Sequence, residues 1–191
     1  MRIFAALLPD EITSERLEEL LDVRRDAEPA WRWTMPEQWH VTLAFAGAAP
    51  ARRVDDVVEA LTAIAAATPP PVLRPAGAGA FPHPDAAKVL WLGVVPADGP
   101  EERLGDLAAV CRTAFARHGV EVDGTRFRPH LTVARSGRGL SATRWLRVLD
   151  TVATDLDPWR PPALHLLASH LGEGPRRRPR YETLAALEWR R

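Results

Sequence analysis

The stretches HVTLAF at residues 40–45 and HLTVAR at residues 130–135 share one pattern, a histidine and a threonine separated by one apolar residue. Both stand in alternating runs that are typical of β-strands. The histidine and threonine of each run therefore project from one face, roughly 6.6 Å apart along the strand. The apolar residues that alternate with them along the strands, Phe45 included, are expected to face a core. Two such strands facing each other predict a symmetric acid–base site.

The repetition of the pattern is more informative than either copy. With 6 histidines and 12 threonines in 191 residues, chance gives roughly 0.4 such patterns. A single copy is equally compatible with a half-buried strand histidine beside a threonine chosen for its β-propensity. Two copies, both in alternating apolar runs, favour a functional pair.

Length and composition indicate an ordinary globular protein. A chain of 191 residues suffices for one domain, or for two small lobes that share a cleft. Hydrophobic residues make up 46% and charged residues 26%, and 25 basic residues balance 25 acidic ones. The net charge therefore gives no global basic field for nucleic acid.

Other classes of protein find no support in the sequence. Cys111 is the single cysteine, which excludes a disulfide framework and a thiol-rich metal site, and its helical spacing places it in the core. Residues 1–9 are too short for a signal peptide and are expected to form a first strand. No apolar run approaches the ~20 residues of a membrane span. A cytoplasmic protein without a membrane partner is expected.

Hydrophobic periodicity predicts strands that alternate with helices. The expected strands cover residues 2–8, 31–33, 39–45, 72–80, 88–95, 127–135, 163–171 and 181–189. The expected helices cover residues 11–26, 51–67, 101–117 and 141–156, and a glycine-rich link covers residues 136–139.

The order strand, helix, motif strand, helix occurs twice, which indicates an internal duplication. We therefore expect an α+β fold in which residues 1–191 form a single bilobal domain. Its two similar lobes place antiparallel sheets toward a central cleft and helices on the outside.

The motif residues suit displacement at phosphorus. One histidine of the pair His40 and His130 can accept a proton while the other donates one. The hydroxyls of Thr42 and Thr132 can hold the oxygens of a tetrahedral anion between them. Acidic residues are absent from both motifs and two histidines fall short of a zinc set, so we expect a site without metal. No nucleophile-elbow pattern supports a serine hydrolase.

These motifs resemble those of the two-histidine phosphoesterase superfamily. Within it, WHVTLAFAG at residues 39–47 and FRPHLTVAR at residues 127–135 are similar to the RNA 2′,3′-cyclic phosphodiesterases, also called 2′-5′ RNA ligases. The resemblance also covers residues 2–10, 89–93 and 180–184, and it is weak over residues 136–162. Gln38–Trp39 and Ala46 depart from the usual pattern.

The resemblance implies a substrate, an RNA or nucleotide end with a 2′,3′-cyclic phosphate that is opened to a 2′-phosphate without a cofactor. His40 would protonate the departing O3′ and His130 would activate water, while Thr42 and Thr132 would hold the phosphate. Reversible 2′-5′ RNA ligation is a further implied activity. We expect a monomer.

Three further residues are candidates for substrate contacts. Arg135 matches a family position after the second motif, but strand parity alone turns it away from His130, so it must lie at a strand end or beyond a bulge. Arg128 has the right parity and precedes a proline. Phe127 could stack on a base or pack in the core.

Several alternatives stay open. The arginine-rich run at residues 176–180 could guide a polynucleotide or form a solvated loop. The enzyme could act on a small cyclic nucleotide such as ADP-ribose cyclic phosphate. The chain could also be a non-catalytic module that binds RNA ends, although both motifs are intact. A bell-shaped pH dependence near neutrality would separate an enzyme from a binding module.

Overall fold

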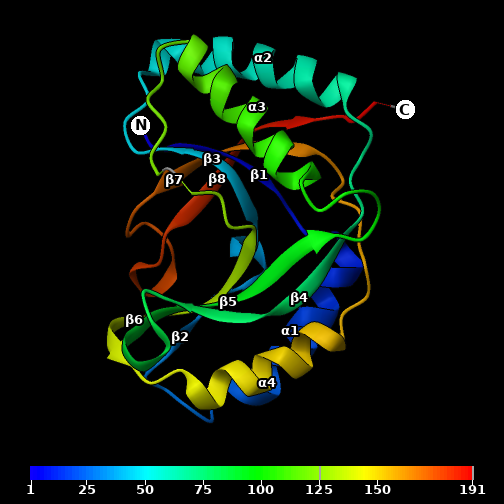
Figure 1. Ribbon diagram of the computed structural model, residues 1–191. Coiled ribbons are helices and arrows are strands. Elements are labelled where there is room, and N and C mark those ends of the chain that lie inside the picture. The colour runs from blue at the N-terminus through cyan, green and yellow to red at the C-terminus, as the bar shows by residue number, and fades with distance from the viewer. Residues whose placement is uncertain (125, 191) are drawn as a thin grey trace.

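The computed structural model describes residues 1–124 and 126–190, and the side chain of Arg176 lies outside the described part. Two four-stranded antiparallel sheets face each other, with helices on their outer sides (Figure 1). The first sheet has the order β3 (Val41–Ala46), β1 (Ile3–Leu7), β7 (Leu164–His170) and β8 (Arg180–Leu187). The second has the order β2 (Arg32–Trp33), β6 (His130–Leu140), β5 (Ala87–Pro96) and β4 (Leu73–Phe81). The predicted α+β fold of two similar lobes is confirmed.

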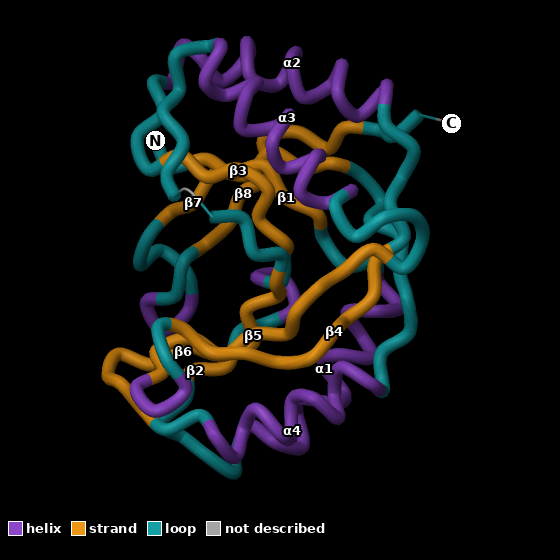
Figure 2. The backbone as a smooth tube through the Cα atoms, viewed as in Figure 1, coloured by secondary structure: helices purple, strands orange, loops and turns teal. Residues whose placement is uncertain are grey.

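Two of the helices pack outside the lobe that does not contain the strand preceding them. α2 (Val54–Ala67) and α3 (Arg103–Arg117) cover the first sheet, whereas α1 (Glu11–Arg25) and α4 (Thr143–Thr154) lie together outside the second (Figure 2). α1 follows the first strand of one sheet but packs beside α4 of the other lobe. α3 follows β5 but packs against β3. Each half of the chain thus contributes a helix to the other lobe, so neither half can bury its apolar faces alone.

Local signals explain where the helices begin and which face they bury. The Asp10 side chain caps α1 by accepting a hydrogen bond from the Thr13 amide at 2.8 Å. Leu17 and Leu21 of this helix are fully buried, and Leu61 occupies the same kind of position in α2. These residues belong to one core that spans both lobes and includes Cys111, as its spacing predicts.

Several expected boundaries differ from the structure, two of them beside the motifs. The segment 136–139, expected to be a link, continues β6 to Leu140, which pairs with Ala87. Gly139 permits this pairing, because a Cβ atom there would lie 3.3 Å from the backbone of Ala86. Before the first motif, a 3-10 turn (Pro36–Gln38) delays the start of β3 until residue 41.

The hydroxyl of Thr34 joins the two motif segments. It accepts a hydrogen bond from the Trp39 indole at 2.9 Å and donates one to the Thr132 carbonyl at 2.8 Å. The Thr34 amide also donates to the Val133 carbonyl at 2.9 Å. Trp39 is 1% exposed and belongs to the core, so it does not form a wall of the cleft. This buried chain ties the residue before His40 to the second motif strand.

Replacing Thr34 by valine keeps the side-chain shape but leaves the Trp39 indole and a main-chain carbonyl without partners. We expect the free energy of unfolding to fall by about 1–3 kcal/mol, measured by urea denaturation. Thr34→Ser retains the hydroxyl and should keep most of the stability. Equal stability of Thr34→Val and the wild type would show that the chain of hydrogen bonds is not needed.

Candidate active site

A bulge interrupts the second motif strand directly after its threonine. In the register of β5 against β6, Val133 is an extra residue between the paired Thr132 and Ala134. An extra residue reverses the alternation of a strand. Arg135 therefore lies on the face of Thr132, and both line a pocket that also contains His40. The bulge that Arg135 requires to reach this face is present.

The first motif strand has a bulge at the equivalent position. Leu43 is the extra residue between Thr42 and Ala44, which pair with consecutive residues of β1. Phe45 consequently packs in a small second cluster with Phe4, on the side of the sheet that carries the site. The expectation that Phe45 faces the main core is wrong, because the alternation does not continue through the bulge.

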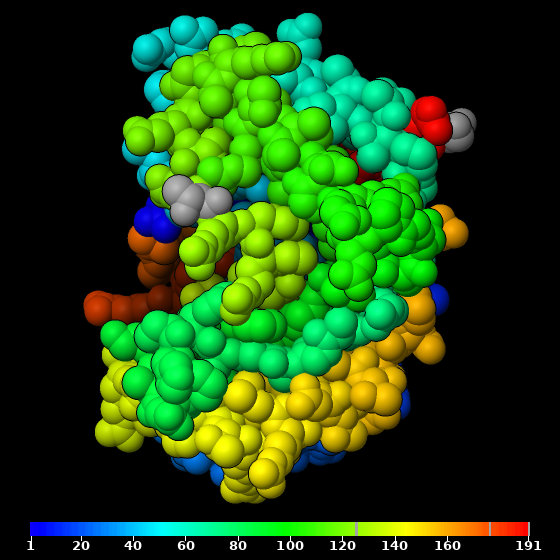
Figure 3. All heavy atoms as spheres, in the orientation of Figure 1, coloured from blue at the N-terminus to red at the C-terminus, as the bar shows by residue number. Residues whose placement is uncertain are grey.

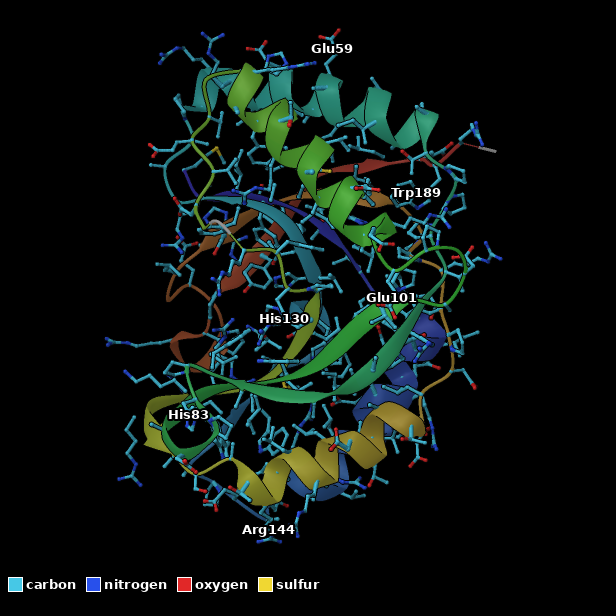
Figure 4. The ribbon with its side chains drawn as sticks, viewed as in Figure 1. Glu59, His83, Glu101, His130, Arg144 and Trp189 are labelled. Atoms are coloured by element: carbon cyan, nitrogen blue, oxygen red, sulfur yellow. The ribbon has the colours of Figure 1, made fainter. Side chains whose placement is uncertain are left out.

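Main-chain carbonyls orient both histidine rings in the same way. The His40 Nδ1–H donates to the Gln38 carbonyl at 2.8 Å, and the His130 Nδ1–H donates to the Arg128 carbonyl at 2.6 Å. With Nδ1 protonated, the Nε2 atom of a neutral ring keeps its lone pair for a reacting group. His130 lies at the centre of the molecule, between the two sheets (Figure 4).

Aromatic rings from neighbouring strands hold each imidazole. The contacts, as distances between ring centroids, are Phe4 at 4.8 Å and Tyr181 at 5.1 Å for His40, and Phe81 at 5.2 Å and Trp91 at 5.8 Å for His130. Such packing restricts each ring to one orientation and removes water from its faces. The histidines therefore stand in similar, largely apolar surroundings.

Burial and nearby positive charge favour neutral histidines. Burial is the main cause that lowers the pKa of His40 from 6.5 to about 4, the hydrogen bond to Gln38 acts against it, and the charges of Arg135 and His130 lower it further. Burial also lowers the pKa of His130, again with a contribution from Arg135. The two rings thus share one cationic neighbour, and the charge of His130 also acts on His40.

The remaining candidates for substrate contacts, Arg128 and Phe127, do not line the pocket beside His40. The Arg128 guanidinium is 5.8 Å from the ring centroids of both Phe81 and Trp91, beside His130. Phe127 is half-buried, packs partly against the core and lines a shallow pocket with Phe81 and Arg128. Residues 126–128 run across the space between the two lobes in yellow-green (Figure 3).

The arginine-rich run divides in two. Arg177 and Arg178 line the pocket beside His40, whereas Arg180 forms an ion pair with Glu173 at 2.9 Å. The side chain of Arg176 lies outside the described residues.

The sequence does not identify several residues of the site. The four rings that hold the histidines belong to β1, β4, β5 and β8, and no spacing along the chain relates them to either motif. The same holds for Arg32 and Gln38, which line the pocket at His40. Phe4, Trp91 and Tyr181 each lie in a predicted strand and in a stretch that resembles the family, but neither signal relates them to a histidine.

The described residues contain no cluster of three or more histidine, cysteine, aspartate or glutamate side chains that could hold a metal ion. None of the helices in the described ranges has the length and apolar character needed to cross a membrane.

Comparisons with known proteins agree on one family. The family model described as the 2′-5′ RNA ligase superfamily matches residues 9–173. An RNA 2′,3′-cyclic phosphodiesterase of Geobacillus stearothermophilus is 30% identical over 92% of this chain, but the match spans only 54% of that protein. A protein of the same name from Methanothermobacter thermautotrophicus is 30% identical over 71% of each chain.

Solved structures support the same assignment. A crystal structure of a Thermus thermophilus protein superposes with a TM-score of 0.75 at 26% identity, covering 100% of this chain and 98% of that chain. E. coli LigT complexed with 3′-AMP superposes with a TM-score of 0.64 at 26% identity, covering 97% of each chain.

The low pKa of His40 can be measured by NMR of its ring nitrogens. We expect a titration midpoint near 4, and a higher one in Arg135→Gln, which removes a positive neighbour. Because the unfolded chain binds this proton at a pH up to about 6.5, the free energy of unfolding should fall as the pH falls from 6.5 toward 4. Arg52→Gln, which removes an exposed guanidinium elsewhere, should leave the midpoint in place. A midpoint at or above 6.5 would contradict the described environment.

Proposed function

The chain belongs to the 2′-5′ RNA ligase superfamily, and on this premise we propose that it hydrolyses 2′,3′-cyclic phosphates at RNA ends to 2′-phosphates. One observation carries the proposal. Two histidines, one from each lobe, are oriented alike by carbonyl groups, and Thr132 and Arg135 line a pocket with His40. This arrangement provides a proton acceptor, a proton donor and a positive charge for an anion.

The reaction follows as an in-line displacement. Nε2 of His130 takes a proton from water as the water oxygen attacks phosphorus, and the bond between phosphorus and O3′ breaks on the opposite side. Nε2 of His40 donates its proton to O3′, so the 2′-phosphate and a free 3′-hydroxyl leave. The Nδ1 hydrogen bonds stabilise each ring in its cationic form as well as its neutral one. A 5′-hydroxyl in place of water would give 2′-5′ ligation.

The phosphate itself makes the acid available. In the free protein burial is the main cause that lowers the pKa of both histidines, and the guanidinium of Arg135 lowers it further. A cyclic phosphate bound beside Arg135 carries a negative charge that offsets this effect and raises the pKa of His40. The hydroxyls of Thr42 and Thr132 then donate to the non-bridging oxygens, whose charge grows in the transition state. Substrate binding and protonation of His40 are thus coupled.

Since each lobe contributes one histidine, we propose that residues 1–191 act as a single bilobal domain and that a monomer is sufficient for activity. No metal or organic cofactor is required by this mechanism, because the strained five-membered ring and the histidine pair lower the barrier. The proposed partners are RNA or nucleotide ends with a cyclic phosphate, in the cytoplasm.

Removal of either histidine should abolish most of the activity. We expect His40→Ala and His130→Ala each to lower kcat by ~10²–10⁴-fold with the fold intact. Phosphorus NMR of adenosine 2′,3′-cyclic phosphate, and of a short RNA with a cyclic end, should show conversion to the 2′-phosphate by the wild type and by His118→Ala. A 3′-phosphate product would reverse the assigned leaving group. Binding without turnover would favour a module that only binds RNA ends.

Chelation distinguishes this mechanism from metal-assisted hydrolysis. Turnover should be the same with and without EDTA, because water is activated by His130 and the phosphate charge is held by Arg135 and the threonines. Loss of turnover in EDTA, with recovery on adding a divalent cation, would overturn the histidine-pair mechanism.

A further inference from the structure

The pocket beside His40 carries more positive charge than one cyclic phosphate requires. It has a volume of about 190 Å³, and its walls include Arg32, Arg135, Arg177 and Arg178. No aspartate or glutamate is among the described residues that line it. In a chain with equal numbers of acidic and basic residues, this is a local excess of cationic groups. Such an excess is typical of an anion-binding site.

Two of these arginines stand directly opposite each other. Arg32 of β2 pairs with Arg135 of β6 in the antiparallel register. Like charges at directly opposed positions destabilise a sheet. Within the described part of the chain, neither guanidinium forms an ion pair with a carboxylate. Both arginines are exposed, so water screens part of this repulsion, and an anion bound between or beside them would offset the rest.

The loop that supplies Arg177 is held in place at a conformational cost. Arg177 has a φ of 59° and is the only non-glycine residue with positive φ among those that the structure describes. Side chains rarely adopt this region, and residues held there often serve a site. The Gln38 side-chain amide fixes the loop by donating to the Pro179 carbonyl at 3.0 Å, while the Gln38 main-chain carbonyl orients His40. One residue thus links the loop to the proposed acid.

The arginines of this loop differ in whether they form ion pairs. Arg180 is neutralised by Glu173 at 2.9 Å and by Glu182 at 3.7 Å. Arg177 makes no ion pair with any carboxylate of the described residues. Since Arg135 already accounts for the charge of the cyclic phosphate, Arg32 and Arg177 are available for a second anion.

The direction of the reaction decides which anion this is. In the proposed function, on which this step rests, O3′ departs on the side of His40. The ribose that carries O3′ must then lie on that side, and its C5′ extends into the adjoining pocket. The pocket volume of about 190 Å³ suits one sugar and its phosphate, because pockets that take whole drug-sized ligands measure about 300–1,000 Å³.

We propose that Arg32 and Arg177, assisted by Arg178, bind the phosphodiester on the 5′ side of the terminal nucleotide. This contact makes the enzyme selective for the ends of polynucleotides over 2′,3′-cyclic mononucleotides, which carry only a 5′-hydroxyl. Guanidinium groups suit this role because they form paired hydrogen bonds with phosphate oxygens.

The test compares three substrates at one ionic strength: adenosine 2′,3′-cyclic phosphate, its 5′-phosphorylated form, and the dinucleotide ApA with a 2′,3′-cyclic end. For the wild type we expect kcat/KM to be about 10- to 100-fold higher for the two substrates with a 5′-phosphate. Arg32→Gln and Arg177→Gly should each reduce this ratio several-fold. Glycine tolerates the positive φ at position 177, so Arg177→Gly removes the guanidinium without backbone strain.

Matched variants distinguish the loss of this contact from a loss of catalysis and from a change in the net charge of the protein. Arg177→Lys should retain part of the ratio. Arg135→Gln should lower kcat/KM for all three substrates alike, and Arg52→Gln, a distant exposed arginine, should leave the ratio as in the wild type. Equal kcat/KM values for the substrates with and without a 5′-phosphate would overturn this inference and leave the proposed function standing. No turnover of any of the three would overturn the proposed function, and the inference with it.

Discussion

The hydroxyl of Thr34 is the contact on which the arrangement of the site depends. It accepts a hydrogen bond from the Trp39 indole and donates one to the Thr132 carbonyl, and Thr34 and Thr132 are 98 residues apart in the sequence. Trp39 directly precedes His40, and Thr132 belongs to the motif of His130. Because water does not reach this chain of hydrogen bonds, its geometry is restricted. The two histidines therefore keep their positions although different sheets carry them.

The two lobes use the same main-chain arrangement with different side chains. Each motif strand has a bulge after its threonine, and each histidine donates from Nδ1 to the carbonyl two residues before it. The residue that the bulge turns toward the site is Phe45 in one lobe and Arg135 in the other. The main chain is thus alike in both lobes, but at this position only the second lobe places a positive charge. This matches a reaction in which one histidine must donate a proton and the other must accept one.

Positive charge has two effects in this cleft. In the proposed reaction it attracts the phosphate. It also adds to burial, the main cause, in keeping the histidines neutral while the site is empty, since the charge of Arg135 lowers the pKa of both further. An anion that neutralises this charge favours protonation of a ring at the moment when an acid is needed. The opposed pair Arg32 and Arg135 fits the same proposal, because two like charges that repel each other in the empty site would both attract a bound anion.

The sequence alone determined the strands, the helices, the duplicated α+β fold and the four motif residues, because alternation and spacing are local properties of the chain. By strand parity, Arg135 needed a strand end or a bulge to reach the site. The pairing of β5 with β6 provides that bulge. The exchange of α1 and α3 between lobes, the aromatic rings around each histidine and the pocket at Arg32 and Arg177 were decided by the tertiary structure. These features join residues from distant strands. No periodicity along the chain encodes which residues packing brings together.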